Sequence, residues 1–341
     1  MNVAQTNSSE VYSSALSPQP LEVKQSIANH VRRWGGSASI TLLDPSCSLF
    51  SIPSIKGIIG YRLESNCVVV FGDPLCEPEN IPTLTKAFHH YCDEQGWSIV
   101  YATASRNFAQ WAIHHTCHSL IEVGEELFLD PFCVPKSGLK VRLLRNKVSK
   151  ARREGSTVNE YRGGDFKLEK AIEQVGEDWL KNRKGLQIYL AEVQLFSERI
   201  GKRWFYAKQH DRVVGVLLLH RIEARHGWLI QLSLTTPDAP IGTSEQLVTT
   251  VLETLREEGC HFLAFGIAQI EQLGEIAGLN KLAEWVARMV FKAAGRIFHL
   301  DRRKKYWSKF QPQTEPSYVL CNRSFGLREL KALMRALNVD V

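Results

Sequence analysis

Two stretches of the sequence share one plan, and this repeat constrains the fold more than any other feature. Residues 67–104 read as an apolar strand, a Gly-Asp-Pro turn, an amphipathic helix that stops at Gly96, and a second strand. Residues 228–268 repeat that order with a Pro-Asp-Ala-Pro turn and a stop at Gly259. Hairpin-like sequence precedes each copy. Hairpins followed by a strand-helix-strand crossover predict an α/β (α+β) fold with a mixed sheet flanked by helices in each half.

The helix of the second copy carries the clearer local signals. Thr243 and Gln246 have the spacing of a capping box at its start. Its apolar residues recur at helical spacing and predict a buried stripe. The stripe consists of Leu247, Val248, Val251, Leu252 and Leu255.

The composition is typical of a globular protein with room for two domains, since 44% of the 341 residues are apolar and 23% are charged. Residues 1–20 are polar and lack the basic and apolar segments of a signal peptide, so they predict a disordered N-terminal tail. A boundary near residues 136–138 then separates an N-terminal domain, residues 21–136, from a C-terminal domain, residues 137–341, that opens with a basic helix.

The sequence also bears on the compartment. No apolar run approaches the roughly 18 residues that crossing a bilayer requires, and the run at 213–219 is only strand-sized. Eight cysteines are scattered without a C-x-x-C pair, which favours free thiols in a reducing compartment. We therefore expect a cytoplasmic protein whose membrane contact, if any, is peripheral at the inner face.

Positive charge is concentrated in two segments. Residues 140–153, around "VRLLRNKVSKARREG", hold seven Lys and Arg and no acid, and residues 291–309 carry a formal charge of +6. The two segments carry formal charges of +7 and +6 and the whole chain carries +6, so the remaining residues together carry a formal charge of −7. In the first segment Val141, Leu144, Val148 and Ala151 form one helical stripe, which leaves the basic side chains to face solvent or an anion. The asymmetry favours a polyanionic partner, either a phosphodiester backbone or an anionic membrane surface.

Four segments extend this interpretation to a family. "YRLESNCVVVFGDP", "PDAPIGTSEQL", "REEGCHFLAFGIA" and "KFQPQTEPSYVL" resemble, in order, segments of the C-terminal domain of phosphatidylglycerol lysyltransferases (lysylphosphatidylglycerol synthases). The resemblance covers about residues 38–325. It implies two tandem GNAT-like domains and transfer of an aminoacyl group from aminoacyl-tRNA to a lipid hydroxyl. Members with the full architecture carry a membrane flippase domain, which the resemblance does not place in this sequence, so lipid flipping is not expected.

The resemblance also implies a site. Asp238, in the Pro-Asp-Ala-Pro turn, and Lys309, in the "KFQP" segment, are the candidate catalytic residues, although Asp238 fits a simple turn former nearly as well. Where the resemblance implies an acid and, three residues later, an arginine, the chain has Gln231 and Leu234, which fits a changed acceptor, a changed aminoacyl group or a lost activity. Candidate substrate-binding residues are Gln231, Gly242, Thr243, Arg296 and Tyr318. Candidate tRNA-binding residues are Arg145, Lys147, Lys150, Arg153, Arg302, Arg303 and Lys305.

Three other interpretations have weaker support. A metal site at "HHTCH", residues 114–118, is disfavoured because neighbours on a helix point in different directions. An acetyl-CoA-dependent acetyltransferase would need a glycine-rich pyrophosphate loop, which neither crossover has. A protein that only binds RNA or anionic membranes, with a lost transferase activity, stays open. We expect aminoacyl-tRNA and an anionic phospholipid or membrane surface as partners, and no metal or cofactor; the oligomeric state is left open.

Overall fold

The structure is a computed structural model that describes residues 10–12, 21–44, 46–135, 137–182, 195–196, 198–298 and 301–337. The chain forms two compact units, and each is discontinuous in sequence. Unit 1 comprises residues 1–124, 270–294 and 316–341, and unit 2 comprises residues 125–269 and 295–315. The units therefore differ from the domains expected on either side of residues 136–138, because C-terminal segments return to unit 1. Most of the predicted tail lies outside the described residues; its residues 10–12 form strand β1 (Glu10–Tyr12).

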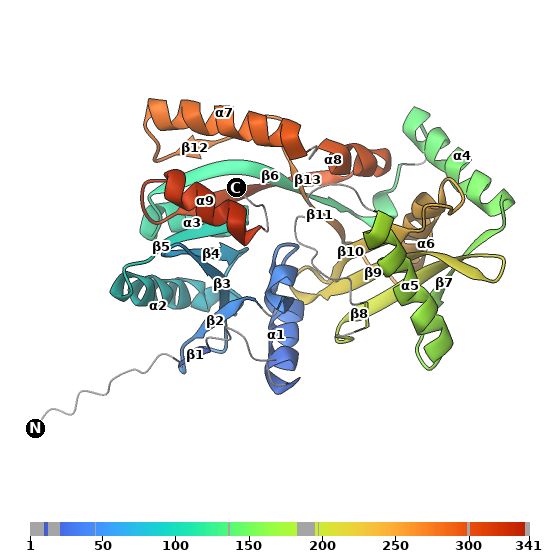
Figure 1. The fold of residues 1–341 in the computed structure, drawn as a ribbon, viewed down its shortest axis with the longest axis horizontal. Coiled ribbons are helices and arrows are strands. Elements are labelled where there is room, and N and C mark those ends of the chain that lie inside the picture. The colour runs from blue at the N-terminus through green and yellow to red at the C-terminus, as the bar shows by residue number, and fades with distance from the viewer. Residues whose placement is uncertain are drawn as a thin grey trace, which may run out of the picture. The chain divides into compact units, whose positions relative to one another are not determined.

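Unit 1 contains a mixed sheet in the order β1-β2-β3-β4-β5-β13 (Figure 1). Its strands after β1 are β2 (Ser48–Ser51), β3 (Ile59–Glu64), β4 (Cys67–Phe71), β5 (Ser98–Ala104) and β13 (Gln313–Cys321). The β4 and β5 strands are parallel and joined through helix α2 (Ile81–Glu94), whereas the other pairs are antiparallel. Strand β6 (Ser119–Leu129) contains the boundary between the units, and β12 (Ile276–Ala277) pairs with its first half. The predicted crossover at residues 67–104 is confirmed.

Both faces of the unit 1 sheet are covered. Helices α2 and α3 (Arg106–His115) pack on one face, where Phe88 and Phe108 join Tyr61 and Tyr101 in one core. Helices α1 (Leu21–Trp34) and α9 (Leu327–Ala336) contribute to a second core with the alternate residues of the same strands. Alternation along buried strands explains why β4 is buried at every position.

Unit 2 repeats the plan with the strand order β11-β10-β9-β8-β7. Its strands are β7 (Ser156–Tyr161), β8 (Lys202–Gln209), β9 (Arg212–Ile222), β10 (Gly227–Thr235) and β11 (Leu263–Gln269). Strands β10 and β11 are parallel and joined through helix α6 (Thr243–Glu257) (Figure 1). The predicted second crossover is confirmed, and so is the α/β fold class with its mixed sheets.

The helices of unit 2 cover the two faces differently. Helix α6 packs on one face through the stripe expected from the sequence, and helix α5 (Phe166–Asn182) packs on the other. The basic segment forms helix α4 (Leu139–Arg153), and its predicted stripe is buried at Val141, Val148 and Ala151 and half-buried at Leu144. It packs against α6. Helix α7 (Lys281–Phe298) begins in unit 1 and ends in unit 2, where α8 (Asp301–Trp307) and a short 3-10 turn, η5 (Ser308–Phe310), follow it.

The predicted capping box at the start of α6 is wrong. The residue before the helix is Gly242, which has no side chain to cap it. Thr243 instead donates its hydroxyl to the carbonyl of Pro240, and Gln246 donates its side-chain amide to the carbonyl of Ser156. Both side chains therefore hold α6 to neighbouring backbone, and neither closes the free helix end.

Among the described residues, no helix combines the length and the apolar character that a bilayer crossing would require.

Candidate functional site

The turn between β10 and α6 is fixed by its own backbone. The amide of Thr236 donates to the carbonyl of Val214 on β9, and the pairing of β10 with β9 ends there. The amide of Ala239 donates back to the carbonyl of Thr236. Two prolines restrict the backbone of the turn: Pro237 follows Thr236, and Pro240 follows Ala239. The turn therefore brings the chain from the end of a buried strand directly to the first residue of α6.

Gly242 allows this turn to approach α4 closely. Its φ of +102° lies in a region that side-chain-bearing residues rarely adopt. A Cβ at this position would lie 2.2 Å from the carbonyl oxygen of Lys147, which is a fixed backbone atom of α4. The glycine is thus required for the packing of α4 against the start of α6.

A pocket of about 540 Å³ lies at this turn. The described residues that line it come from the end of α5, the last residue of β10, the turn, and the first residues of α6. They are Trp179, Asn182, Thr235, Thr236, Pro237, Ala239, Pro240, Ile241, Gly242, Thr243 and Ser244. Open α/β sheets bind ligands at such a position, beyond the carboxyl end of a parallel strand.

Glu245, in the first turn of α6, lies between two lysines. Its Oε1 atom accepts hydrogen bonds from Lys147 on α4, at 2.9 Å, and from Lys309 on η5, at 2.7 Å. The hydroxyl of Ser244 donates to its other oxygen. Burial of the side chain, which is only 5% exposed, would raise its pKa, but the two lysines outweigh burial and lower the pKa to about 2. At neutral pH this cluster therefore consists of one carboxylate and two ammonium groups, with one net positive charge.

Ser244 connects the cluster to the pocket, because it lines the pocket and also bonds Glu245. Lys309 additionally lies over the ring of Tyr306, with its ammonium 4.1 Å from the ring centroid. The amides of Ser244 and Glu245 have no acceptor among the described residues, as expected for the first turn of a helix. Two free amides and a net positive cluster at the N-terminus of α6 favour a negative charge in this part of the pocket.

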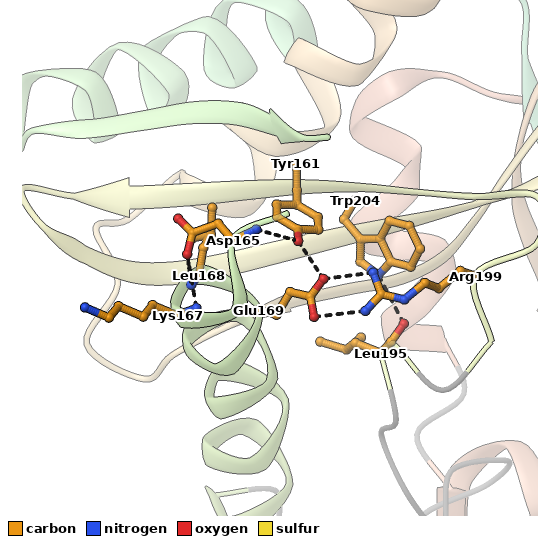
Figure 2. Close-up of polar contacts among 8 residues, drawn as sticks. All are labelled: Tyr161, Asp165, Lys167, Leu168, Glu169, Leu195, Arg199 and Trp204. Carbon is orange, nitrogen blue, oxygen red and sulfur yellow. Dashed lines mark hydrogen bonds and ion pairs between the residues drawn. The ribbon is translucent and has the colours of Figure 1, made fainter. Parts of the chain in front are cut away.

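Helix α5, whose last turn lines the pocket, carries a second polar cluster, formed around the buried carboxylate of Glu169 near its start (Figure 2). Glu169 accepts two hydrogen bonds from the guanidinium of Arg199, at 2.8 and 2.9 Å, and one from the hydroxyl of Tyr161 on β7. The bidentate bond from Arg199 and the Tyr161 bond lower the pKa of Glu169, so the carboxylate stays ionised. These contacts tie α5 to the sheet, and Trp179 and Asn182 at its far end are positioned with it.

Strand β10 is irregular before it reaches the pocket. Its pairing with β9 shifts register between Ile230 and Leu232, which makes Gln231 a bulge residue. Its pairing with β11 covers only Trp228 and Leu229 among the described residues, although both strands continue further. The side-chain oxygen atoms of Gln231 and Ser233 are buried and have no hydrogen-bond partner in the described part of the chain. Leu234 is buried in the α5 core.

The structure brings some predicted site residues together and leaves others apart. Gly242 and Thr243 line the pocket, and Lys147 and Lys309 meet at Glu245.

Asp238 is the one residue of 235–244 outside the lining. Its exposed carboxylate pairs with Arg212, and this ion pair lowers the pKa of Asp238. Tyr318 packs in the core of unit 1. The side chain of Arg296 lies outside the described part of the structure.

The predicted tRNA-binding residues fall into two groups. On α4, Arg145, Lys150 and Arg153 are exposed and lie outside the buried stripe. On α8, Lys305 is exposed, whereas Arg303 donates to the carbonyl of Phe265 at 2.8 Å. The side chain of Arg302 lies outside the described residues.

Sequence reasoning missed Glu245, Ser244 and Trp179. An acid in the first turn of a helix is usually solvent-exposed and stabilised by the helix dipole, so Glu245 carried no distinctive signal. Its role depends on two lysines that lie 98 residues before it and 64 residues after it. Trp307 is buried against Phe265 with nearly parallel rings, so it belongs to the core of unit 2.

The fold and the pocket define an α/β protein with mixed sheets and a pocket at the start of a crossover helix. The family model described as "Phosphatidylglycerol lysyltransferase, C-terminal" matches residues 31–321. The chain therefore belongs to this family, as the sequence resemblance predicted.

Individual relatives agree with this assignment. The chain is 22% identical to a phosphatidylglycerol lysyltransferase of Staphylococcus epidermidis over 309 residues, which cover 88% of the chain and 36% of the relative. The corresponding protein of Staphylococcus aureus is also 22% identical, over 90% of the chain and 37% of its own length. The chain thus spans little more than a third of the curated relatives it matches.

Solved structures support the fold. The structure of L-PGS from Bacillus licheniformis superposes with a TM-score of 0.76 at 18% identity, covering 92% of this chain and 96% of that one. A C-terminal domain from Agrobacterium fabrum gives a TM-score of 0.75 at 19% identity with the same coverage.

Proposed function

We propose that the protein is an aminoacyltransferase that moves an aminoacyl group from aminoacyl-tRNA to the hydroxyl of a phosphatidylglycerol-type lipid. Family membership and the names of the relatives support transfer to a lipid, and the transferred group in those relatives is lysyl by name. The exposed basic face of α4 supports a tRNA donor, because a row of cations suits a phosphodiester backbone.

The proposed chemistry is an ester exchange. The lipid hydroxyl oxygen attacks the carbonyl carbon of the aminoacyl ester and forms a tetrahedral oxyanion. The bond to the tRNA ribose oxygen then breaks, and that oxygen takes up the proton that the lipid hydroxyl loses. Because the donor ester is already activated, the protein has to align two substrates, exclude water and stabilise the oxyanion.

The pocket at the start of α6 is the observation that carries the proposal. Free amides of Ser244 and Glu245 are suited to bind the oxyanion, as in other acyl transfers. Lys309 would add positive charge beside them, with Glu245 fixing the position of its ammonium. Trp179 and the two prolines of the turn supply apolar walls that reduce access of water. Asp238 stays a candidate catalytic residue in the same turn.

The test is transfer with purified components. We expect labelled lysine from lysyl-tRNA to appear in phosphatidylglycerol as an alkali-labile product. Phosphatidic acid, which is anionic but lacks a headgroup hydroxyl, is the matched control and should accept nothing. If no aminoacyl-tRNA gives a lipid product although the protein binds tRNA, the binding-only alternative is correct. Acetyl transfer from acetyl-CoA would instead identify an ordinary acetyltransferase.

A further inference from the structure

Helix α7 presents a row of large apolar side chains to solvent. Leu282 is 72% exposed, Trp285 61% and Met289 52%, and Val286 and Val290 are also exposed. Their spacing of three and four residues places all five on one face of the helix. We call these five residues the α7 apolar stripe.

The stripe is the reverse of the usual arrangement for a surface helix. Such helices normally turn their large apolar residues toward the core and leave polar residues outside. Among the α7 side chains that the structure describes, residues 281–293, the half-buried ones are Ala283, Glu284, Ala287 and Phe291, so three of these four are small or charged. A continuous exposed apolar stripe of this kind marks an interaction surface.

The charge around the stripe indicates what covers it. Residues 281–298 contain four basic residues and one acid, Glu284. That acid is neutralised within the helix by Arg288, at 2.8 Å, and Arg288 also donates to the carbonyl of Leu273. Lys281 and Lys292 are exposed and have no ion pair among the described residues. The surface beside the stripe is therefore positive.

These features fit a lipid surface better than a second copy of the chain. Two copies meeting through this helix would bring like charges together around the contact, whereas anionic headgroups would neutralise them. Tryptophan and lysine beside an aliphatic row are typical of helices that lie at the boundary between headgroups and acyl chains.

We propose that α7 docks on an anionic membrane surface, with the α7 apolar stripe inserted among the lipids and Lys281 and Lys292 against the headgroups. This inference deepens the proposed function and rests on it only for the biological role of docking. A docked α7 would keep the enzyme at the membrane that contains its acceptor. The docking itself is measured separately from transfer.

The experiment measures binding of the full chain to phosphatidylcholine vesicles with and without phosphatidylglycerol. We expect Leu282→Ser combined with Met289→Ser to weaken binding about tenfold or more, because two large apolar groups no longer leave water. Leu63→Ser combined with Leu327→Ser is the matched control, since both leucines are exposed apolar residues of unit 1 outside α7. The control should bind as the wild type does.

Two further readouts define the geometry. Brominated lipids should quench the fluorescence of the wild type more than that of Trp285→Phe, which reports insertion of Trp285. Lys281→Gln with Lys292→Gln should remove most of the preference for phosphatidylglycerol. The proposal is overturned if the variant with Leu282→Ser and Met289→Ser, the stripe variant, binds vesicles as the wild type does. It is also overturned if the wild type forms a dimer without lipid and the stripe variant loses that dimer but still binds vesicles.

Transfer assays separate this proposal from the proposed function. The stripe variant should transfer normally to short-chain, water-soluble phosphatidylglycerol and poorly to vesicles. Vesicle binding without any transfer in the wild type would leave docking intact and remove the enzymatic proposal. Equal losses on both acceptors would show that the stripe belongs to the reaction site, which overturns its role in docking.

Discussion

The ammonium group of Lys309 lies 2.7 Å from the Oε1 atom of Glu245, whose side chain is buried in the first turn of α6. A buried carboxylate and a partly exposed lysine thus hold η5 against the helix that opens the pocket. The same oxygen also accepts from Lys147, so one acid ties α4, α6 and η5 together.

This ion pair makes stability depend on pH. Folding lowers the pKa of Glu245 from 4.5 to about 2, so its contribution is complete above pH 4.5 and is lost as the pH falls toward 2. We expect Glu245→Gln to lower the unfolding free energy at neutral pH by on the order of 3 kcal/mol. Urea unfolding between about pH 3 and 7 should show a flatter pH profile in the variant than in the wild type.

Glu253→Gln is the control for that measurement. Glu253 lies on the same helix but is exposed. A wild-type profile is expected for this variant. If Glu245→Gln and Glu253→Gln behaved alike, the buried pair would contribute nothing to folding.

Lys309 should matter for turnover more than for folding. We expect Lys309→Ala to reduce the transfer rate about 100-fold, the loss typical of one oxyanion donor, while Lys147 still pairs Glu245 and limits the loss of stability. Single-turnover transfer and a thermal melt measure the two effects. Lys309→Arg should recover part of the rate, and Lys170→Ala, an exposed lysine of α5, should leave it unchanged. A normal rate for Lys309→Ala would place the reaction centre elsewhere.

Asp238 is exposed and paired with Arg212, and two variants separate catalysis from turn formation. If its carboxylate acts on substrate, Asp238→Asn should cut turnover, whereas Arg212→Gln, which removes the same ion pair, should not. We expect this difference in the steady-state rate. Equal effects would assign Asp238 to holding the turn.

Gly242 should be intolerant of any side chain. Gly242→Ala would set a Cβ 2.2 Å from the carbonyl of Lys147 in addition to its strained φ, so we expect a loss of at least about 2 kcal/mol in unfolding free energy. Gly259→Ala is the matched control, because Gly259 also has a positive φ but no atom within 4 Å of the added Cβ. A similar cost for both would show that backbone strain, and not the packing against α4, explains the glycine.

The exposed basic face of α4 should determine affinity for tRNA. We expect Arg145→Glu, Lys150→Glu and Arg153→Glu together to weaken tRNA binding and to reduce its salt dependence by about one unit of slope for each phosphate that is no longer neutralised. Filter binding over a salt series measures both. The matched triple reversal at Lys86, Lys167 and Lys170, which are exposed on α2 and α5, should have a smaller effect. Equal effects would mean that α4 acts only through net charge.

The sequence predicted local structure better than long-range contacts. The two crossovers and the stripe of α4 follow from periodicity and turn residues, which act over a few neighbours. The pairing of β13 with β5 joins Tyr318 to Ala104, and no local signal reports which strand a terminal segment will join. The capping box failed for the same reason, since Gln246 bonds a carbonyl 90 residues away.

The position of the candidate site was predictable from the sequence, and the residues that form it were less so. The turn at 237–242 and Lys309 were found from the segments of the family resemblance, and the structure places both at the start of α6. The partner of Lys309 could not be found this way, because the burial of Glu245 depends on how α4 and η5 pack. The part of the pocket that α5 forms with Trp179 could likewise be found only from the tertiary structure.

The return of β13 to β5 has a consequence for biosynthesis. The edge of β5 is complete only after residues 313–321 leave the ribosome, roughly 10 to 40 s after β5 itself at ordinary elongation rates. During that interval the nascent N-terminal segment carries an unpaired strand edge, which is a template for aggregation. Chains that terminate early would keep that edge, so quality control should remove C-terminal truncations faster than equally long truncations at the other end.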